Sequence, residues 1–286
     1  MEALFYNKLD FNTVECTLCP HYCKIQSNHV GICKSRKNNN GVLEAEAYGK
    51  ICSVAIDPIE KKPLNHFLPG TKTFSIASPG CNFKCDNCQN DGISQHSIND
   101  VNISYMSPED VVEQALPHGS ISYTYTEPLI FFEYIYDTAR LARNKGLKNI
   151  IVSNGYINEE PLKMIIPYLD AANIDLKCFD ENKHKIITKG KLEVVLNTLK
   201  LLKSNNVWLE ITNLVIPGWT DDTKMIFNMC EWLVSNGFSE NPLHFLRFFP
   251  RYKMNEGFES TKLETLETAK NIALGCGMKF VYLGNV

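Results

Sequence analysis

The sequence predicts an α/β fold, a partial TIM-like (β/α)6 barrel preceded by a small cysteine-rich extension. From about residue 73 onward, short apolar runs alternate with segments whose apolar residues recur at helical spacing. Residues 1–72 break this rhythm and hold five of the eleven cysteines. Strands that alternate with helices usually pair in parallel through right-handed crossovers, which gives a complete or partial barrel.

The N-terminal extension is predicted to span residues 1–72 and the barrel core residues 73–286. Asn40-Gly41 is a turn signal, and β-like runs follow at 42–48 and 51–56, which favours a short β-hairpin in the extension. Seven apolar runs of the core predict strands at 74–77, 121–124, 149–152, 172–176, 207–215, 243–248 and 279–282.

Helix start and stop signals lie between these runs. Ser107-Pro108 offers an N-cap followed by a proline at the first helical position, and Thr220-Asp221-Asp222 caps a later segment. Apolar residues at helical spacing predict the core-facing sides of three helices, over 192–202, 225–233 and 263–273.

Composition excludes several classes of protein. The chain has 286 residues, 44% of them hydrophobic, and a formal net charge of −3, so no global basic field favours nucleic acid or membrane binding. The longest apolar stretch, 129–136, is short and contains Glu133. Residues 1–5 lack the basic start and apolar core of a signal peptide. We therefore expect a cytoplasmic protein, because a reducing compartment suits so many cysteines better as metal ligands than as disulfides.

Three cysteines share one short loop directly after the first predicted strand of the core. Cys81, Cys85 and Cys88 have C-x3-C-x2-C spacing. Electron-transfer ferredoxins hold four irons with four thiolates, so three thiolates leave one iron of a [4Fe–4S] cluster open to a substrate or cofactor. A zinc site usually takes four ligands, and a redox C-x-x-C pair leaves Cys81 unexplained. The spacing thus predicts a catalytic iron–sulfur cluster.

A second group of cysteines lies in the extension. Cys16, Cys19, Cys23 and Cys33 supply four thiolates, enough to close a structural site. The spacing is compatible with zinc, with an auxiliary iron–sulfur cluster, or with free thiols in a loop that faces the substrate.

Polar residues follow the successive core strands, at the end of a barrel where chemistry takes place. They include a carboxylate at a helix start, an amide, and two opposite charges two positions apart. These residues are Thr126, Glu127, Asn154, Asp175 and Lys177, with Ile216 and Arg247 after later strands. Together they predict a pocket for a charged cofactor. The adjacent Lys61 and Lys62 are expected to be solvated.

At these motifs the chain resembles the radical S-adenosylmethionine (SAM) superfamily, of which the C-x3-C-x2-C loop is the hallmark. It is most similar to the pyruvate formate-lyase activating enzyme-like group, within the branch named for the AmmeMemoRadiSam system. The segments that carry this resemblance are 16–23, 55–64, 80–90, 123–128, 247–254 and 281–286.

The resemblance implies that the open iron chelates the amine and carboxylate of S-adenosyl-L-methionine. An electron then cleaves the sulfonium to methionine and a 5′-deoxyadenosyl radical, which abstracts hydrogen from a substrate. By position, Glu127 and the Thr126 backbone would bind the methionyl amine. Asn154, Asp175 and Lys177 would contact the ribose or the carboxylate, Val215 or Ile216 the adenine, and Arg247 the substrate or the cofactor carboxylate. Tyr125-Thr126 departs from the glycine pair that is usual before the glutamate.

The substrate stays open at this point. A small electron-donor protein, such as flavodoxin or ferredoxin, is expected as a partner, and the substrate could be a protein or peptide. One alternative is a glycyl-radical enzyme activase, which would need a partner with an acceptor glycine. A second is an RNA-modifying enzyme, which the acidic pI near 6.2 disfavours. A third is a non-enzymatic adaptor protein that carries a metal cluster.

Overall fold

The computed structural model describes residues 1–286. The strands are β1 (Tyr6–Lys8), β2 (Val14–Cys16), β3 (Lys24–Ile25), β4 (Arg36–Asn39), β5 (Val42–Ala45), β6 (Lys50–Ile51), β7 (Ser53–Pro58), β8 (Lys72–Ala77), β9 (Ser104–Tyr105), β10 (Ser120–Tyr123), β11 (Lys148–Ser153), β12 (Ala171–Asp175), β13 (Trp208–Val215), β14 (Leu243–Arg247) and β15 (Val281–Gly284). The α-helices are α1 (Asp91–Ser94), α2 (Pro108–Ala115), α3 (Phe132–Asn144), α4 (Glu159–Ile165), α5 (Glu181–Thr188), α6 (Leu192–Ser204), α7 (Thr223–Ser235) and α8 (Leu263–Gly275). Short 3-10 turns are η1 (Ile59–Lys61), η2 (Leu116–His118), η3 (Pro128–Phe131) and η4 (Ile166–Tyr168).

The core of the molecule is an eight-stranded sheet with the order β15-β14-β13-β12-β11-β10-β8-β7. Seven of these strands are parallel, and β7 pairs antiparallel with β8 at one edge. The predicted α/β fold is confirmed, because all seven apolar runs form parallel strands joined by six helical crossovers. The two edge strands, β15 and β7, do not pair with each other, so the barrel is partial.

Boundaries differ from the prediction where strand pairing decides them. The last strand was expected at 279–282 but runs Val281–Gly284, because its ladder with β14 starts at Val281. The backbone N–H of Lys279 donates instead to Ser239, outside the sheet. No helix is both long and apolar enough to cross a membrane.

Helix starts follow the capping signals. At the start of α2, Ser107 and Asp110 form a capping box, with Pro108 at the first helical position. At the start of α7, the Asp222 side chain accepts a hydrogen bond of 2.7 Å from the backbone N–H of Met225. These caps fix where α2 and α7 begin.

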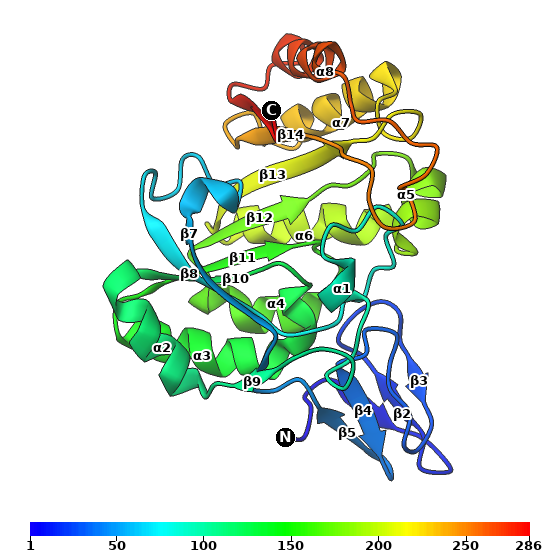
Figure 1. Ribbon diagram of the computed structural model, residues 1–286, viewed down its shortest axis with the longest axis vertical. Helices are drawn as coiled ribbons and strands as arrows, with labels where there is room; N and C mark the ends of the chain where they lie inside the picture. Colours follow the sequence, from blue (N-terminus) through cyan, green and yellow to red (C-terminus); the bar gives the residue numbers. More distant parts are fainter.

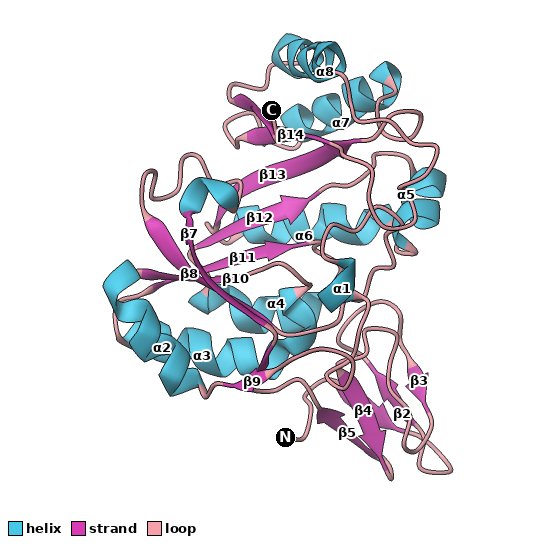
Figure 2. Ribbon diagram, in the orientation of Figure 1, coloured by secondary structure: helices cyan, strands magenta, loops and turns pink.

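Figures 1 and 2 show where those strand ends lie. The arrowheads of β11 and β12 point toward the side on which α1 and α5 lie. The N-terminal strands β2–β5, drawn in blue in Figure 1, lie below α1. In barrels of this kind the reactive residues lie at the carboxyl ends of the parallel strands. The cysteine loop and the cofactor candidates are therefore expected at this end.

The N-terminal residues form a three-stranded sheet, β1-β2-β3, and the hairpin β4–β5. Asn40 and Gly41 make the hairpin turn, both with positive φ angles (50° and 89°), which asparagine and glycine adopt more readily than other residues. β7 also lies within residues 1–72, yet it pairs along its whole length with β8 of the main sheet. The division at residue 72 stays a prediction.

One buried ion pair joins the hairpin to the core. Arg36 of β4 and Glu133 of α3 are each 1% exposed, and Arg36 Nη2 donates to Glu133 Oε1. The same Glu133 oxygen accepts a 2.7 Å hydrogen bond from the backbone N–H of Leu4, and Arg36 Nη1 donates to the Leu4 carbonyl at 2.9 Å. Buried charges are tolerated only when paired and hydrogen-bonded, so this contact fixes how the extension docks.

Replacing one partner of this pair should destabilise the protein strongly. Arg36→Met leaves the Glu133 carboxylate buried without its cation, and we expect a loss of about 3–5 kcal/mol in the free energy of unfolding. The double variant Arg36→Met/Glu133→Leu should recover much of this loss. Denaturant titration measures both values. Lys148→Met, which removes the exposed partner of Asp170, is the control and should cost under about 1 kcal/mol. An Arg36→Met loss no larger than the control would contradict the assigned role.

A second buried carboxylate lies near the amino end of β13. Glu210 of β13 is fully buried and accepts hydrogen bonds of 2.9 Å each from the backbone N–H groups of Asn65 and His66. His244 Nε2 of β14 lies 2.7 Å from the same carboxylate. Burial raises the pKa of Glu210, but the hydrogen bonds from His244 and the two amides outweigh it and hold the pKa below its usual value.

The Glu210 contacts predict a specific acid sensitivity. Its folded-state pKa lies below the unfolded value of about 4.3, so the stability it contributes is present above that pH. This stability is lost as the pH falls through the folded-state pKa. We expect the urea midpoint of the wild type to fall more steeply below about pH 4.3 than that of Glu210→Gln. Glu264→Gln, on the first turn of α8, is the control and should keep the wild-type slope. Equal slopes in Glu210→Gln and the wild type would refute the assignment.

Candidate functional site

The three-cysteine loop starts directly after β8 and is held by its neighbours on every side. The Asn82 side chain donates to the Tyr156 carbonyl at 2.7 Å and accepts from the Asn154 amide at 2.9 Å. The backbone N–H of Lys84 donates to the Thr188 carbonyl at the end of α5. The Asp86 carbonyl accepts from the N–H groups of Lys253 and Met254. The loop is thus tied to segments from three different parts of the chain.

Phe83 anchors the loop in the core. Its ring is 1% exposed and packs against Tyr156 and His184, with ring centroids 5.0 and 5.8 Å apart. Gly190 faces this ring so closely that a Cβ atom there would lie 2.3 Å from Phe83. Only glycine fits at position 190 without moving the ring, and hence the loop.

Two of the three sulfur atoms, those of Cys81 and Cys88, have polar neighbours within hydrogen-bond range. The backbone N–H of Phe83 donates to Cys81 Sγ at 3.3 Å, and Asn154 Nδ2 lies 3.7 Å from the same sulfur. Cys88 Sγ and Ser94 Oγ are 3.0 Å apart. Burial raises the pKa of Cys81 well above its usual value and raises that of Cys85 to about 12.

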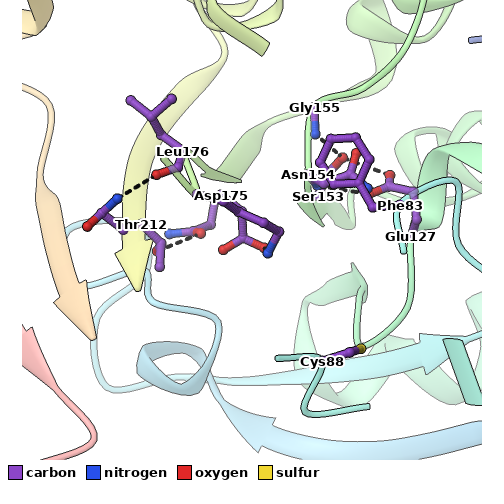
Figure 3. A network of polar contacts seen from close by, with 12 residues as sticks. Phe83, Cys88, Glu127, Ser153, Asn154, Gly155, Asp175, Leu176 and Thr212 are labelled. Atoms are coloured by element: carbon purple, nitrogen blue, oxygen red, sulfur yellow. Dashed lines mark hydrogen bonds and ion pairs between the residues drawn. The ribbon is translucent and has the colours of Figure 1, made fainter. Parts of the chain in front are cut away.

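Glu127, Ser153 and Asn154 form a buried network at the ends of β10 and β11 (Figure 3). Glu127 is 1% exposed and accepts hydrogen bonds from the backbone N–H of Leu129 at 3.0 Å, from Ser153 Oγ at 2.8 Å and from the backbone N–H of Asn154 at 2.8 Å. Burial raises the pKa of Glu127 to about 7, although these hydrogen bonds act to lower it. The sequence placed Glu127 and Asn154 at one end of the barrel, and the structure brings them into direct contact.

Asp175 and Lys177 lie at the end of β12 and form an ion pair of 2.9 Å. Both are half-buried. Burial lowers the pKa of Lys177, but the charges of Asp175 and Cys85 outweigh it, so the pKa is raised and the ammonium stays charged. The Asp175 charge also acts on Glu127. These two predicted residues therefore lie within electrostatic reach of both the cysteine loop and the Glu127 network.

The remaining predicted residues are less closely joined to the loop. Thr126 Oγ1 donates to the Ser78 carbonyl at 2.6 Å, just before the loop. Ile216 is buried in a small cluster with Phe248 and Met254, and the N–H of Met254 donates to the loop at Asp86. Arg247 instead donates from Nε to the Thr261 carbonyl at 2.8 Å and stacks on Phe249, so no contact joins it to the other site residues.

One buried polar cluster was missed by the sequence prediction. Lys61 is solvated as expected, but Lys62 is not: its side chain is 1% exposed and pairs with Asp57 at 2.6 Å. Lys62 Nζ also donates to Tyr125 Oη at 3.3 Å, and Tyr125 immediately precedes the predicted cofactor residues. The charge of Lys62 is buried because η1 turns it inward toward β7. The only sequence signal was its place in one of the family-like segments, 55–64.

The four N-terminal cysteines line one small, partly open cavity, together with Asn82 of the three-cysteine loop. The structure has no group of three or more His, Cys, Asp or Glu side chains placed to hold a single metal ion. In a [4Fe–4S] cluster each iron takes its own thiolate, so the thiolates need not converge on one point as they do around zinc.

The chain is similar in sequence and in fold to several known proteins. The model of the Radical SAM superfamily matches residues 75–230, more than half of the chain. An uncharacterised protein of Methanocaldococcus jannaschii is 46% identical over all of this chain and 85% of its own length. Pyruvate formate-lyase 1-activating enzyme of Escherichia coli is 24% identical over 75% of this chain and 93% of its own length. In fold, a radical SAM methyltransferase from Sphaerobacter thermophilus matches 77% of this chain and 68% of its own with a TM-score of 0.57 at 10% identity.

The three-cysteine loop at the strand ends, the partial barrel and the family match over residues 75–230 all agree. The chain belongs to the radical SAM superfamily.

Proposed function

We propose that this enzyme cleaves S-adenosylmethionine reductively at a [4Fe–4S] cluster held by Cys81, Cys85 and Cys88, and uses the 5′-deoxyadenosyl radical to abstract hydrogen from a substrate. Membership of the superfamily implies both cofactors and makes the protein an enzyme rather than a metal-carrying adaptor. The observation that carries the proposal is the three-thiol loop, which contains no fourth cysteine and is fixed at the ends of the parallel strands.

The donor set fits a cluster held at three corners. Three thiolates supply one ligand to each of three irons and leave the fourth iron without a protein sulfur. The N–H of Phe83 and the amide of Asn154 direct hydrogen toward Cys81 Sγ, which stabilises a thiolate. The Lys177 ammonium acts on Cys85 and Cys88 and offsets their negative charge. Burial by Phe83 and its neighbours keeps water from this side of the loop.

The charges around the loop fit a zwitterionic amino-acid group. The Glu127 carboxylate acts on Cys81, whereas the Lys177 ammonium acts on Cys85 and Cys88. A cationic amine is attracted to the Glu127 carboxylate, and an anionic carboxylate is attracted to the Lys177 ammonium. We therefore assign the methionyl amine to Glu127 and the Thr126 backbone. Asn154, Asp175 and Lys177 contact the carboxylate or the ribose.

The buried Asn87 side chain indicates where the adenine would bind. Its Oδ1 atom is buried beside Cys88 and has no hydrogen-bond partner. A buried acceptor without a partner is costly, and an exocyclic amino group on a ligand would satisfy it. Ile216, in the apolar cluster that touches this loop through Met254, would cover the face of the ring. The contacts of Arg247 with Thr261 and Phe249 favour a role in shaping the substrate side over direct cofactor binding.

Reductive cleavage can be tested directly. Anaerobically reconstituted enzyme with dithionite and S-adenosylmethionine should form 5′-deoxyadenosine, measured by chromatography against an enzyme-free blank. Cys85→Ala removes one corner ligand, so it should lose both the iron of this cluster and the product. Cys230→Ala, in the buried face of α7, is the matched control and should keep both. A Cys85→Ala variant with full activity would refute the ligand assignment, and a fully loaded wild type without product would refute the activity.

The role of Lys177 predicts a separate effect on cofactor affinity. Lys177→Met removes the cation proposed to bind the carboxylate, and a charged hydrogen bond contributes about 1.5–3 kcal/mol, so Kd for S-adenosylmethionine should rise roughly 10- to 100-fold. The iron content should not change. Binding is measured by equilibrium dialysis under anaerobic conditions. Lys185→Met, on the outer side of α5, is the control. An unchanged Kd in Lys177→Met would remove this residue from the cofactor site.

A glycyl-radical activase is the second candidate function. It is favoured by the relationship to pyruvate formate-lyase 1-activating enzyme, which extends over 75% of this chain. The substrate would then be a protein, and a small donor such as flavodoxin or ferredoxin would supply the electron. A stable protein radical in the electron paramagnetic resonance (EPR) spectrum, after mixing with pyruvate formate-lyase, separates this candidate from a small-molecule activity.

A further inference from the structure

The four cysteines of the N-terminal extension line one small, partly open cavity. Cys16 ends β2, Cys19 and Cys23 lie in the connection to β3, and Cys33 lies just before β4. All four line the same cavity of about 10 Å³. Its remaining walls are mainly apolar, and among them are Leu18, Ile25 and Ile130. Four thiols that meet around a shielded space form a closed ligand set, which leaves no position for substrate.

Each of the four sulfur atoms has an N–H group in its surroundings. The backbone N–H groups of His21, Ile32 and Ser35 lie near the sulfurs of Cys19, Cys23 and Cys33 in that order. Arg36 Nη1 lies 3.8 Å from Cys16 Sγ. Hydrogen bonds to sulfur favour the thiolate form and are among the means by which proteins set the potential of iron–sulfur centres. N–H groups near the sulfurs would help to stabilise four metal-bound thiolates.

The size of the cavity favours one of the two metal centres, zinc or an iron–sulfur cluster, with which the spacing is compatible. A space of about 10 Å³ admits roughly one water molecule. Four sulfurs at the ~2.3 Å bond length of a zinc ion close around it and leave no such space. The absence of any three side chains placed for one ion agrees with this wider spacing. In an iron–sulfur cluster the protein sulfurs bind different iron atoms, or at most two share one iron. The sulfurs therefore lie farther apart than they do around a single zinc ion.

We propose that Cys16, Cys19, Cys23 and Cys33 hold a second iron–sulfur cluster, fully ligated by protein. The Arg36 guanidinium, buried beside Cys16, offsets part of the negative charge that four thiolates bring. The apolar part of the lining, Leu18, Ile25 and Ile130 among it, limits the access of water to such a cluster. This inference does not depend on the chemistry proposed for the three-cysteine loop.

The second cluster would lie against the first site. His21 Nε2 is 2.8 Å from the carbonyl of Asn82, and because a carbonyl only accepts, this nitrogen carries the proton. Gly80, directly before Cys81, packs so tightly on the extension that a Cβ atom there would lie 2.3 Å from the Cys33 carbonyl. The Lys84 ammonium lies within electrostatic reach of Cys33, Cys81 and Cys85. Two segments that carry ligands thus touch directly.

The test separates the two sites by variants of the full chain. Cys81→Ala/Cys85→Ala/Cys88→Ala removes the three-cysteine site and leaves the extension untouched. It is reconstituted anaerobically with iron and sulfide while zinc is also supplied. Iron, acid-labile sulfide and zinc are then counted per chain. We expect two to four irons with matching sulfide, and an EPR signal after reduction by dithionite. The additional change Cys19→Ala/Cys23→Ala should abolish both.

Two outcomes would overturn the proposal. One is a triple variant that carries about one zinc and no labile sulfide. The other is a triple variant that carries no metal while circular dichroism shows it folded. Cys230→Ala/Cys276→Ala, which changes two thiols outside both groups, is the matched control and should keep the metal content of the wild type. Because the readout is metal content and not turnover, a wild type that fails to cleave S-adenosylmethionine would not affect this result.

Discussion

The site depends on one chain of hydrogen bonds between side-chain amides and a buried carboxylate. Glu127 accepts from the backbone of Asn154, the Asn154 side chain donates to Asn82, and Asn82 donates to the Tyr156 carbonyl. These bonds join the ends of β10 and β11 to the cysteine loop after β8. Since each group is buried and satisfied by the next, a change at one of them leaves an unpaired partner at another. The position of the three sulfurs is therefore set by the sheet.

The extension and the core share one hydrophobic cluster. The apolar residues of the extension, such as Val14, Ile25 and Leu43, belong to one buried cluster with residues of the core strands and helices. Asn158, before α4, also links the two parts: its backbone N–H donates to the Leu18 carbonyl and its side chain to the Thr17 carbonyl. The extension thus packs against the segments that follow β8 and β11, beside the cysteine loop.

Short-range patterns predicted most of the fold. Each of the seven apolar runs became a strand because a parallel strand buried on both faces needs a continuous apolar segment. Capping residues such as Ser107 and Asp222 marked helix starts because their side chains bond to the next turn of their own backbone. The relative order of strands followed from the rule that consecutive units lie side by side.

Long-range pairs could not be predicted in this way. Arg36 and Glu133 are 97 positions apart, and nothing near either residue signals a buried ion pair. Lys62 was expected to be solvated because adjacent lysines usually are. Its ammonium is instead buried, where it pairs with Asp57 and donates to Tyr125. At the site itself, the strand-end rule placed Glu127, Asn154, Asp175 and Lys177 near one another. It did not separate Arg247, whose partners, Thr261 and Phe249, come from a later loop.

The missing side chain at Gly80 has a consequence for how this sequence can diverge. Its φ angle of 104° and its contact with the Cys33 carbonyl and Ser35 exclude any larger residue unless the neighbouring loop moves as well. A change in either segment would need a compensating change in the other to be tolerated. The two cysteine segments, 47 positions apart at Cys33 and Gly80, should therefore be inherited as a linked pair. Descendants that abandon one are expected to remodel the other.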